Sequence, residues 1–240
     1  MGIPAQFNDI IQRHLKVSAA WLPVTNNFTL GDYGIISEGV FTKMGNIREF
    51  NVAYTTAEGP DASIDFTSAD TTVVKFAAGV EVSVIPAGAI DAKISFKFEK
   101  ERSFLVQAPV IKMTAIDNVN QVATQLKKSD AWERKWKVVY QVYHAIDPVI
   151  VSTISAGTEI TFSGDANALK ELKVGNASVE LGTNKELGLK VMGKAGIIGL
   201  GLFKLGIIGG GPKFLLEEEG ETVQAAIEVI RAIAPSETDL

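Results

Sequence analysis

The 240-residue sequence contains no cysteine, only two histidines, and few aromatic residues, which make up 8% of the chain. Without cysteine the protein forms neither disulfide bonds nor thiolate metal sites, and acylation of cysteine is excluded. The first residues, MGIPAQFNDII, lack a basic segment followed by an apolar one, so no secretory signal is expected and the expected location is the cytoplasm. Hydrophobic residues make up 46% of the chain, which is typical of a globular protein able to bury a core.

Signatures of enzymes are weak. Residues 188–195, GLKVMGKA, approach a phosphate-binding loop, but Ala195 stands where a hydroxyl residue would hold Mg²⁺, and glycine-rich sequence follows instead of a helix. A nucleophile elbow, G-x-S-x-G, is absent. His144 precedes Asp147 by three residues, a spacing that allows a dyad but is more often structural. The sequence therefore favours a protein that is not an enzyme and needs no cofactor.

Acidic charge is concentrated in the last residues. The net charge is −5, and residues 217–240 hold seven acidic side chains and one basic one, which leaves the rest of the chain nearly neutral. The sequence pI of 5.2 argues against nucleic acid as the main partner. Within this tail, one face of a predicted helix that Pro235 ends is marked by Val223, Ile227, Ile230 and Ile233.

Four stretches have the alternating pattern of amphipathic strands: 72–84, 89–99, 149–162 and 177–203. Their apolar positions include Val80, Val82, Val84, Ile94, Phe96, Phe98, Leu187, Leu189 and Val191. The stretches form two sequential pairs, which are separated by a predicted helix over 110–128 and a predicted strand over 135–146. Another amphipathic helix is predicted over 3–16.

Residues 193–213, GKAGIIGLGLFKLGIIGGGPK, are apolar and hold eight glycines. A transmembrane helix needs about 20 apolar residues, whereas Lys204 divides this stretch and each glycine costs a helix about 1 kcal/mol relative to alanine in water. A long strand remains, because a transmembrane strand needs only about 9–11 residues. Pro212, after three glycines, is the expected hinge between a body, 1–211, and a tail, 212–240.

Basic residues cluster around two tryptophans: Lys127, Lys128, Arg134, Lys135 and Lys137 surround Trp132 and Trp136. Such a cluster is either a contact for lipid headgroups or an ordinary solvated turn, and the sequence leaves both open.

The order of these elements resembles the pore-forming domain of gasdermins. The resemblance rests on the first helix, on the segment AAWLPVTNNFTLGDYGIISEGVFTK, on two predicted hairpin regions at 72–106 and about 149–203, and on KWKVVYQVYHA between them. It implies an α+β fold, a twisted and mainly antiparallel sheet with flanking helices and a C-terminal helical tail. It also implies hairpins that refold into membrane-spanning strands when copies of the chain assemble into a β-barrel pore.

The resemblance assigns roles to residues. Lipid contact is expected at Phe7, Ile10, Ile11, Arg13, Leu15, Lys16, Lys127 and Lys128, and the nine apolar strand positions given above would face lipid. The tail positions Val223, Ile227, Ile230 and Ile233 would hold the resting state, and a partner protease would cut near Lys213, Leu216 and Glu219. The expected partners are acidic lipids, that protease and further copies of the chain; the location would change from cytoplasm to cell membrane on activation.

A soluble α+β binding or scaffold protein is the alternative, because half-buried sheet is the commonest meaning of an alternating pattern. In that interpretation the glycine-rich stretch is a core strand with close backbone approaches.

Overall fold

The structure is a computed structural model that describes residues 2–69, 71–75, 92–164, 178–180, 187–192, 195–206 and 211–215. Within these ranges eleven strands form the larger of two sheets, whose central path is β1–β14–β9–β8–β10–β13. These six strands are β1 (Ser18–Ala19), β14 (Gly196–Leu205), β9 (Lys137–Ile146), β8 (Phe104–Ile116), β10 (Val149–Thr153) and β13 (Leu187–Met192). Five more pair beside this path: β2 (Asp32–Ser37), β3 (Val40–Asn46), β4 (Thr56–Glu58), β5 (Ala62–Thr67) and β15 (Pro212–Phe214).

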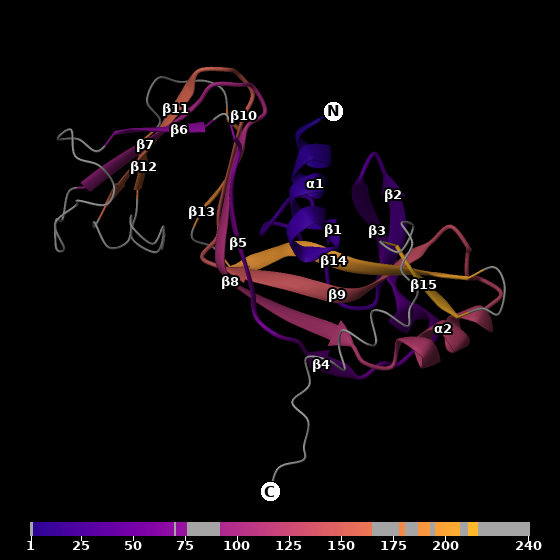
Figure 1. The fold of residues 1–240 in the computed structure, drawn as a ribbon. Coiled ribbons are helices and arrows are strands. Elements are labelled where there is room, and N and C mark those ends of the chain that lie inside the picture. Colours follow the sequence, from indigo (N-terminus) through magenta and orange to yellow (C-terminus); the bar gives the residue numbers. More distant parts are fainter. Residues whose placement is uncertain are drawn as a thin grey trace, which may run out of the picture.

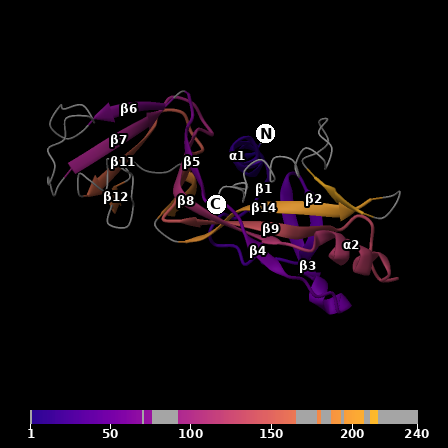
Figure 2. The same cartoon turned by 60° about the horizontal axis from the view of Figure 1, so that its bottom comes forward.

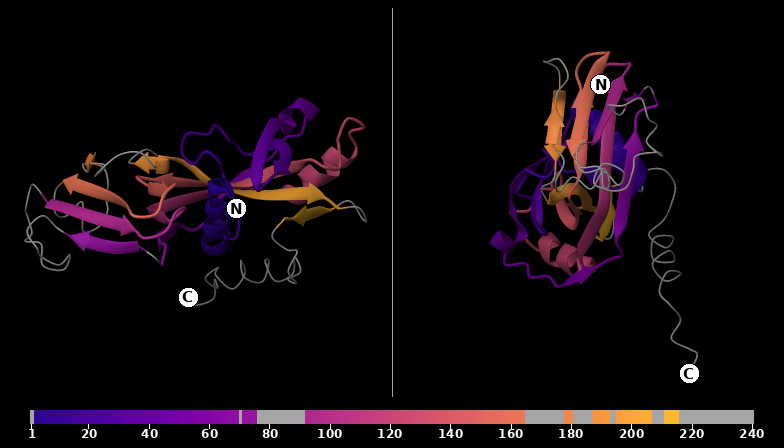
Figure 3. Two further views of the ribbon diagram at one scale, coloured as in Figure 1. Left: turned by 90° about the horizontal axis from the view of Figure 1, so that it is seen from above. Right: turned by 90° about the vertical axis from the view of Figure 1, so that its left-hand side faces the viewer.

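A second sheet of four strands lies at one end of the molecule, in the order β12–β11–β7–β6 (Figures 1 and 2). Its strands are β6 (Thr71–Lys75), β7 (Ala92–Phe98), β11 (Thr158–Gly164) and β12 (Ser178–Glu180). Seen from above, this sheet and helix α2 (Val119–Lys127) lie at opposite ends of an elongated molecule (Figure 3). All pairings between the described strands are antiparallel, which confirms the predicted α+β class; the predicted C-terminal helix lies outside the described residues.

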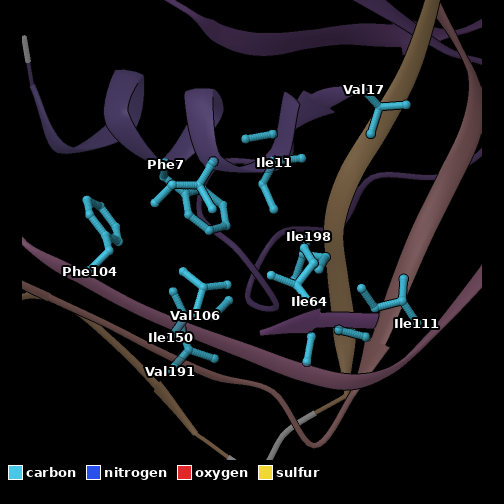
Figure 4. Close-up of a cluster of buried hydrophobic side chains, with 14 residues drawn as sticks. Phe7, Ile11, Val17, Ile64, Phe104, Val106, Ile111, Ile150, Val191 and Ile198 are labelled. Carbon is cyan, nitrogen blue, oxygen red and sulfur yellow. The ribbon is translucent and has the colours of Figure 1, made fainter. Parts of the chain in front are cut away.

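Helix α1 (Ile3–Leu15) covers one face of the larger sheet (Figure 4). Proline in its first turn suits a helix start, where its missing N–H would have no intrahelical partner. Phe7 and Ile11 are fully buried against Phe104, Val106 and other core side chains. Burying side chains of this size contributes about 1.5–3 kcal/mol each, so the docking of α1 holds the sheet together.

The predicted helix over 110–128 is wrong in its first half. Residues 110–116 belong to β8, and α2 begins only at Val119. The two edges of β8 pair with β9 and β10 on one side and with β4 and β5 on the other. Over residues 110–116 only Ile111 and Ile116 are buried and Lys112 is exposed, so strict alternation is missing there. The spacing of Ile116, Val119, Ala123 and Leu126 therefore imitates a longer helix.

A short helical turn, η1 (Ile47–Phe50), follows the β2–β3 hairpin and starts with a capping box of Asn46 and Glu49. At the base of the same hairpin Asp32 is completely buried. Its carboxylate accepts hydrogen bonds from the Thr29 amide at 2.8 Å and the Asn46 side chain at 2.9 Å, and it pairs with Lys43 at 2.9 Å. This network satisfies the buried charge and fixes where the hairpin leaves the sheet.

The glycine-rich stretch forms β14, a strand that pairs with β9 on one side and with the short strand β1 on the other. A Cβ atom on Gly196 would lie 2.5 Å from the carbonyl oxygen of Val24, and one on Gly201 would lie 2.6 Å from Oε1 of Gln141. The glycines therefore allow close packing of backbone and side chains onto a core strand. Pro212, the expected hinge, instead begins β15 and pairs with Leu205.

We predict that Gly196→Ala lowers the free energy of unfolding by about 1–3 kcal/mol, because the added methyl group meets backbone atoms that cannot rotate away. Gly211→Ala is the matched control, since a Cβ there meets nothing within 4 Å. Urea unfolding of both variants measures the difference. Equal midpoints for the two variants would contradict the close approach at Gly196.

Candidate functional site

The four-stranded sheet, called here the hairpin sheet, consists of two hairpins lying side by side. Strands β6 and β7 form the first, β11 and β12 form the second, and β7 pairs with β11 along its whole length. The two amphipathic regions of the sequence, far apart in the chain, are thus joined into one antiparallel sheet. The predicted strands at 72–84 and 89–99 are confirmed over 71–75 and 92–98, and Val80, Val82 and Val84 lie outside the described residues.

The register of the hairpin sheet puts apolar residues opposite apolar residues. Phe96 pairs with Ile160 and with Val73 on its other side, while Ile94 pairs with Phe162. Polar rows alternate with these, as in the pair formed by Lys97 and Glu159. Because directly paired residues share a face, the sheet has one apolar and one polar face.

The apolar face is covered in this conformation wherever side chains are described. Phe98 and Ile160 are 0% exposed and Phe96 is 5% exposed, whereas Lys97 forms an ion pair with Glu99 at the surface. The predicted positions Leu189 and Val191 lie elsewhere, on β13, where they pack in the core beneath α1. Leu187, the third of that group, is the first residue of the same strand.

Each strand of the hairpin sheet continues a strand of the larger sheet, and the order of strands is the same in both: β5–β8–β10–β13 leads to β6–β7–β11–β12. The two inner continuations, from β8 to β7 and from β10 to β11, keep the same pairing register in both sheets. From the pair Phe104–Ser152 to the pair Phe98–Thr158, both strands advance by six residues. The single predicted stretch over 149–162 is thus two strands, β10 and β11, in different sheets.

Between the two sheets the chain turns at a corner, formed by residues 99–103 and 153–157. The amide of Arg102 donates to the carbonyl of Thr153 at 2.9 Å, and the amide of Thr153 donates to the carbonyl of Ser103 at 3.0 Å. Ser103, Ser152 and Thr153 are buried here, and among the described residues Oγ of Ser152 has no hydrogen-bond partner. Arg102 and Gly157 have positive φ angles of 59° and 74°. In the sequence, the pair Ala156-Gly157 interrupts the apolar pattern at this corner, whereas no local pattern indicates the pairing across the two strands.

The residues expected to contact lipid fall into two groups. Phe7, Ile10 and Ile11 are buried in the core and Leu15 packs against it, so lipid contact by these side chains would require α1 to leave the sheet. Arg13 on α1, Lys16 directly after it, and Lys127 and Lys128 at the end of α2 are exposed. The helices pack in separate core clusters, so the structure does not bring the two basic pairs together.

The tryptophans of the basic cluster face protein. Trp132 and Trp136 pack edge to face, with ring centroids 5.2 Å apart, and both contact the ring of Tyr33. Beside them Lys135 forms a surface ion pair with Glu133 at 2.7 Å. The cluster is therefore, in this conformation, a packed aromatic group with solvated charges around it.

The tail is anchored by β15. The ring of Phe214 packs at a tilt against that of Tyr140, with ring centroids 4.7 Å apart, and the amide of Leu215 donates to the carbonyl of Leu202 at 3.1 Å. Lys213, one of the expected cleavage positions, is paired with Lys204 in this strand. Leu216, Glu219 and the tail positions Val223, Ile227, Ile230 and Ile233 lie outside the described residues.

No catalytic arrangement is found in the part of the chain that the structure describes. It contains no group of three acidic, histidine or cysteine side chains that could hold a metal ion. Burial raises the pKa of the Tyr143 phenol, and burial together with Glu49 raises that of Tyr33, which moves both groups further from a proton-transfer role at neutral pH. His144 is exposed, and no hydrogen bond between it and Asp147 is among the described contacts.

No described helix is both long and apolar enough to cross a lipid bilayer. No known family profile matches the sequence, and no curated protein matches it. Among solved structures, the chain is similar to a bacterial gasdermin from Bradyrhizobium tropiciagri, with 16% sequence identity and a TM-score of 0.39, over 88% of this chain and 90% of that one. This score is too low to assign a fold or a function to the chain.

We predict that the buried apolar residues of α1 and the exposed basic residues near its end have different effects when they are substituted. Phe7→Ala should lower the free energy of unfolding by about 3–5 kcal/mol, because it leaves a cavity in the core. Arg13→Gln with Lys16→Gln should leave unfolding unchanged and weaken binding to anionic vesicles by about 2 kcal/mol, since each basic residue contributes about 1 kcal/mol near such a surface.

Vesicle sedimentation at low and high salt measures the second effect, which should vanish at high salt. Glu38→Gln is the control, being an exposed charge of opposite sign in the β2–β3 turn. Equal binding at low salt by the parent, by the Arg13→Gln, Lys16→Gln variant and by Glu38→Gln would show that Arg13 and Lys16 do not contact the lipid.

Proposed function

We propose that this protein is a gasdermin-like pore-former, which permeabilises membranes after a protease removes an inhibitory C-terminal segment. The observation that carries the proposal is the hairpin sheet: two amphipathic hairpins, paired side by side, whose strands continue strands of the body. An enzyme or a simple binding module has no need of this arrangement, whereas a protein that builds a membrane sheet needs amphipathic strands already in order.

The physical requirement for spanning lipid supports assembly. Every backbone N–H and C=O in the hydrocarbon must be paired within the protein, so an open sheet edge is excluded there. Among the described strands, β6 and β12 form the two edges of the hairpin sheet. Several copies must therefore pair edge to edge into a closed β-barrel, and the apolar face of each sheet then contacts lipid.

The resting state has a matching requirement. The apolar face of the hairpin sheet is covered at Phe96, Phe98 and Ile160, so its exposure must follow a trigger. In the proposal the trigger is a cut in the tail beyond Leu215. The backbone of β15 is already hydrogen-bonded in the sheet, and a protease cuts unpaired chain more readily. Lys213 is thereby less suitable than Leu216 or Glu219 as a cleavage position.

The proposed partners follow from this sequence of events. They are acidic lipids, met first by Arg13, Lys16, Lys127 and Lys128, an activating protease, and further copies of the chain. Release of contents from a cell of the producing organism would serve cell death or antiviral defence, and the protein would pass from the cytoplasm to the cell membrane.

Dye release tests the proposal. A recognition site for a specific protease is inserted between Leu216 and Glu217 in the full chain, and the folded protein is added to acidic-lipid vesicles before and after the cut. We predict release only after the cut. Release from both samples would keep the pore and remove the tail as its lock, while release from neither would leave a soluble α+β scaffold.

The orientation of the hairpin sheet has a separate test. Because the chain has no cysteine, single fluorophores can be attached at Ile94→Cys and Ser95→Cys, which the register assigns to opposite faces. After the cut, we predict that a quencher carried on lipid tails quenches the label at 94 and leaves the label at 95 bright. Equal quenching at both positions, or none, would be incompatible with an amphipathic membrane sheet.

A further inference from the structure

The strands use different numbers of residues to pass from the larger sheet to the hairpin sheet. On β7–β8 and β10–β11, six residues separate the last pair of one sheet from the first pair of the other. The next strand outward, β12–β13, has a register shift between the pairs Ser152–Leu189 and Thr153–Leu187, but from Ser152–Leu189 to Thr161–Glu180 both strands still advance by nine residues. Three neighbouring strands can thus run straight through the corner with no net change of register.

The strand at the other edge, β5–β6, differs. Ser68 is bound to Phe104, through its amide at 2.9 Å and its hydroxyl at 2.8 Å, and Thr71 is paired with Phe98. The edge strand therefore advances by three residues where its neighbour advances by six. Fully extended, three residues reach about 10–11 Å, whereas six residues of straight strand cover about 20 Å.

The short edge is compatible only with a bent corner. In the present structure, residues 99–102 and 154–157 turn aside, and the amide of Gly157 reaches the carbonyl of Phe98 at 2.7 Å. If those residues straightened while Ser68 and Thr71 kept their partners, the link between them would be about 10 Å too short.

We propose that the link from Ser68 to Thr71 is a tether that holds the hairpin sheet bent against the body, and that pore formation requires one end of it to come unpaired. This inference rests on the proposed function and adds to it a built-in restraint, separate from the tail. Straightening joins β7–β8 with β10–β11 into one ladder from Ala92 to Gln107 and from Val149 to Gly164, longer than the about 9–11 residues that cross a bilayer. The tether then decides how fast this happens once the tail is cut.

Changing the length of single links tests the tether. Inserting Gly-Ser-Gly between Ala69 and Asp70 gives the edge strand the six residues that its neighbour has. In the full chain with the cuttable tail, we expect dye release after the cut to be at least several-fold faster. The same insertion between Ala156 and Gly157 destroys the common register of β10 and β11 and should slow release by a similar factor. An insertion after Gly39, in an exposed turn, controls for the added residues.

The outcomes separate the tether from the pore. If the parent releases dye and the variant with the insertion after Ala69 releases it no faster than the variant with the insertion after Gly39, the tether proposal is wrong. The proposed pore-forming function is then still supported. If no protein releases dye, the proposed pore-forming function is wrong. Hydrogen exchange in the intact proteins then still tests whether the tether restrains the corner. The tether predicts faster exchange of the Thr153 and Gly157 amides in the Ala69 insertion variant than in the parent and in the Gly39 insertion variant; unchanged exchange there would overturn it.

Discussion

The structure depends on one constraint: the ladder between β8 and β10 has the same register as the ladder between β7 and β11, although the two ladders lie in different sheets. Backbone pairing fixes which residues are neighbours, and a shift of one residue would move every apolar side chain to the opposite face. Because the register is common, the apolar row of Phe96 and Ile160 stays aligned with the body whether the corner is bent or straight. The hairpin sheet can therefore change its angle to the body without re-pairing its inner strands.

The body provides the fixed side of this arrangement. Helix α1 buries Phe7 and Ile11 on the sheet from which β8 and β10 emerge, and β14 with its glycines packs closely against its neighbours in that sheet. Both features concentrate stabilising contacts away from the hairpin sheet. The glycine-rich stretch, which in the sequence could belong to a membrane or to a core, lies in the core of this conformation, as the scaffold interpretation expected.

The sequence allowed prediction of elements whose faces differ in environment. The alternation in 89–99 predicted β7, and the spacing of Phe7, Ile10 and Ile11 predicted α1, because one face of each is apolar. The second half of strand β8 was mistaken for the start of a helix because residues 110–116 lack strict alternation, and Ile116 is spaced from Val119 as on a helix. Pro212 looked like a hinge because three glycines precede it, but a partner strand more than five residues away cannot be recognised from local composition.

The properties of the candidate site that matter most were beyond prediction, because register is a relation between distant residues. Nothing local marks Phe98 as the partner of both Thr158 and Thr71, and the three-residue deficit between Ser68 and Thr71 exists only relative to that pairing. Propensity and periodicity describe one segment at a time, while the tether is a difference between two path lengths.

The distance between positions 97 and 112 tests the central claim most directly. Both side chains are exposed or partly exposed, on β7 and β8, and spin labels on Lys97→Cys and Lys112→Cys are specific in a chain without cysteine. In a straightened strand, fifteen residues span about 50 Å. The account predicts a shorter distance in the intact protein and a shift to about 50 Å on acidic vesicles after the tail is cut. An unchanged distance in membranes that have become leaky would contradict it.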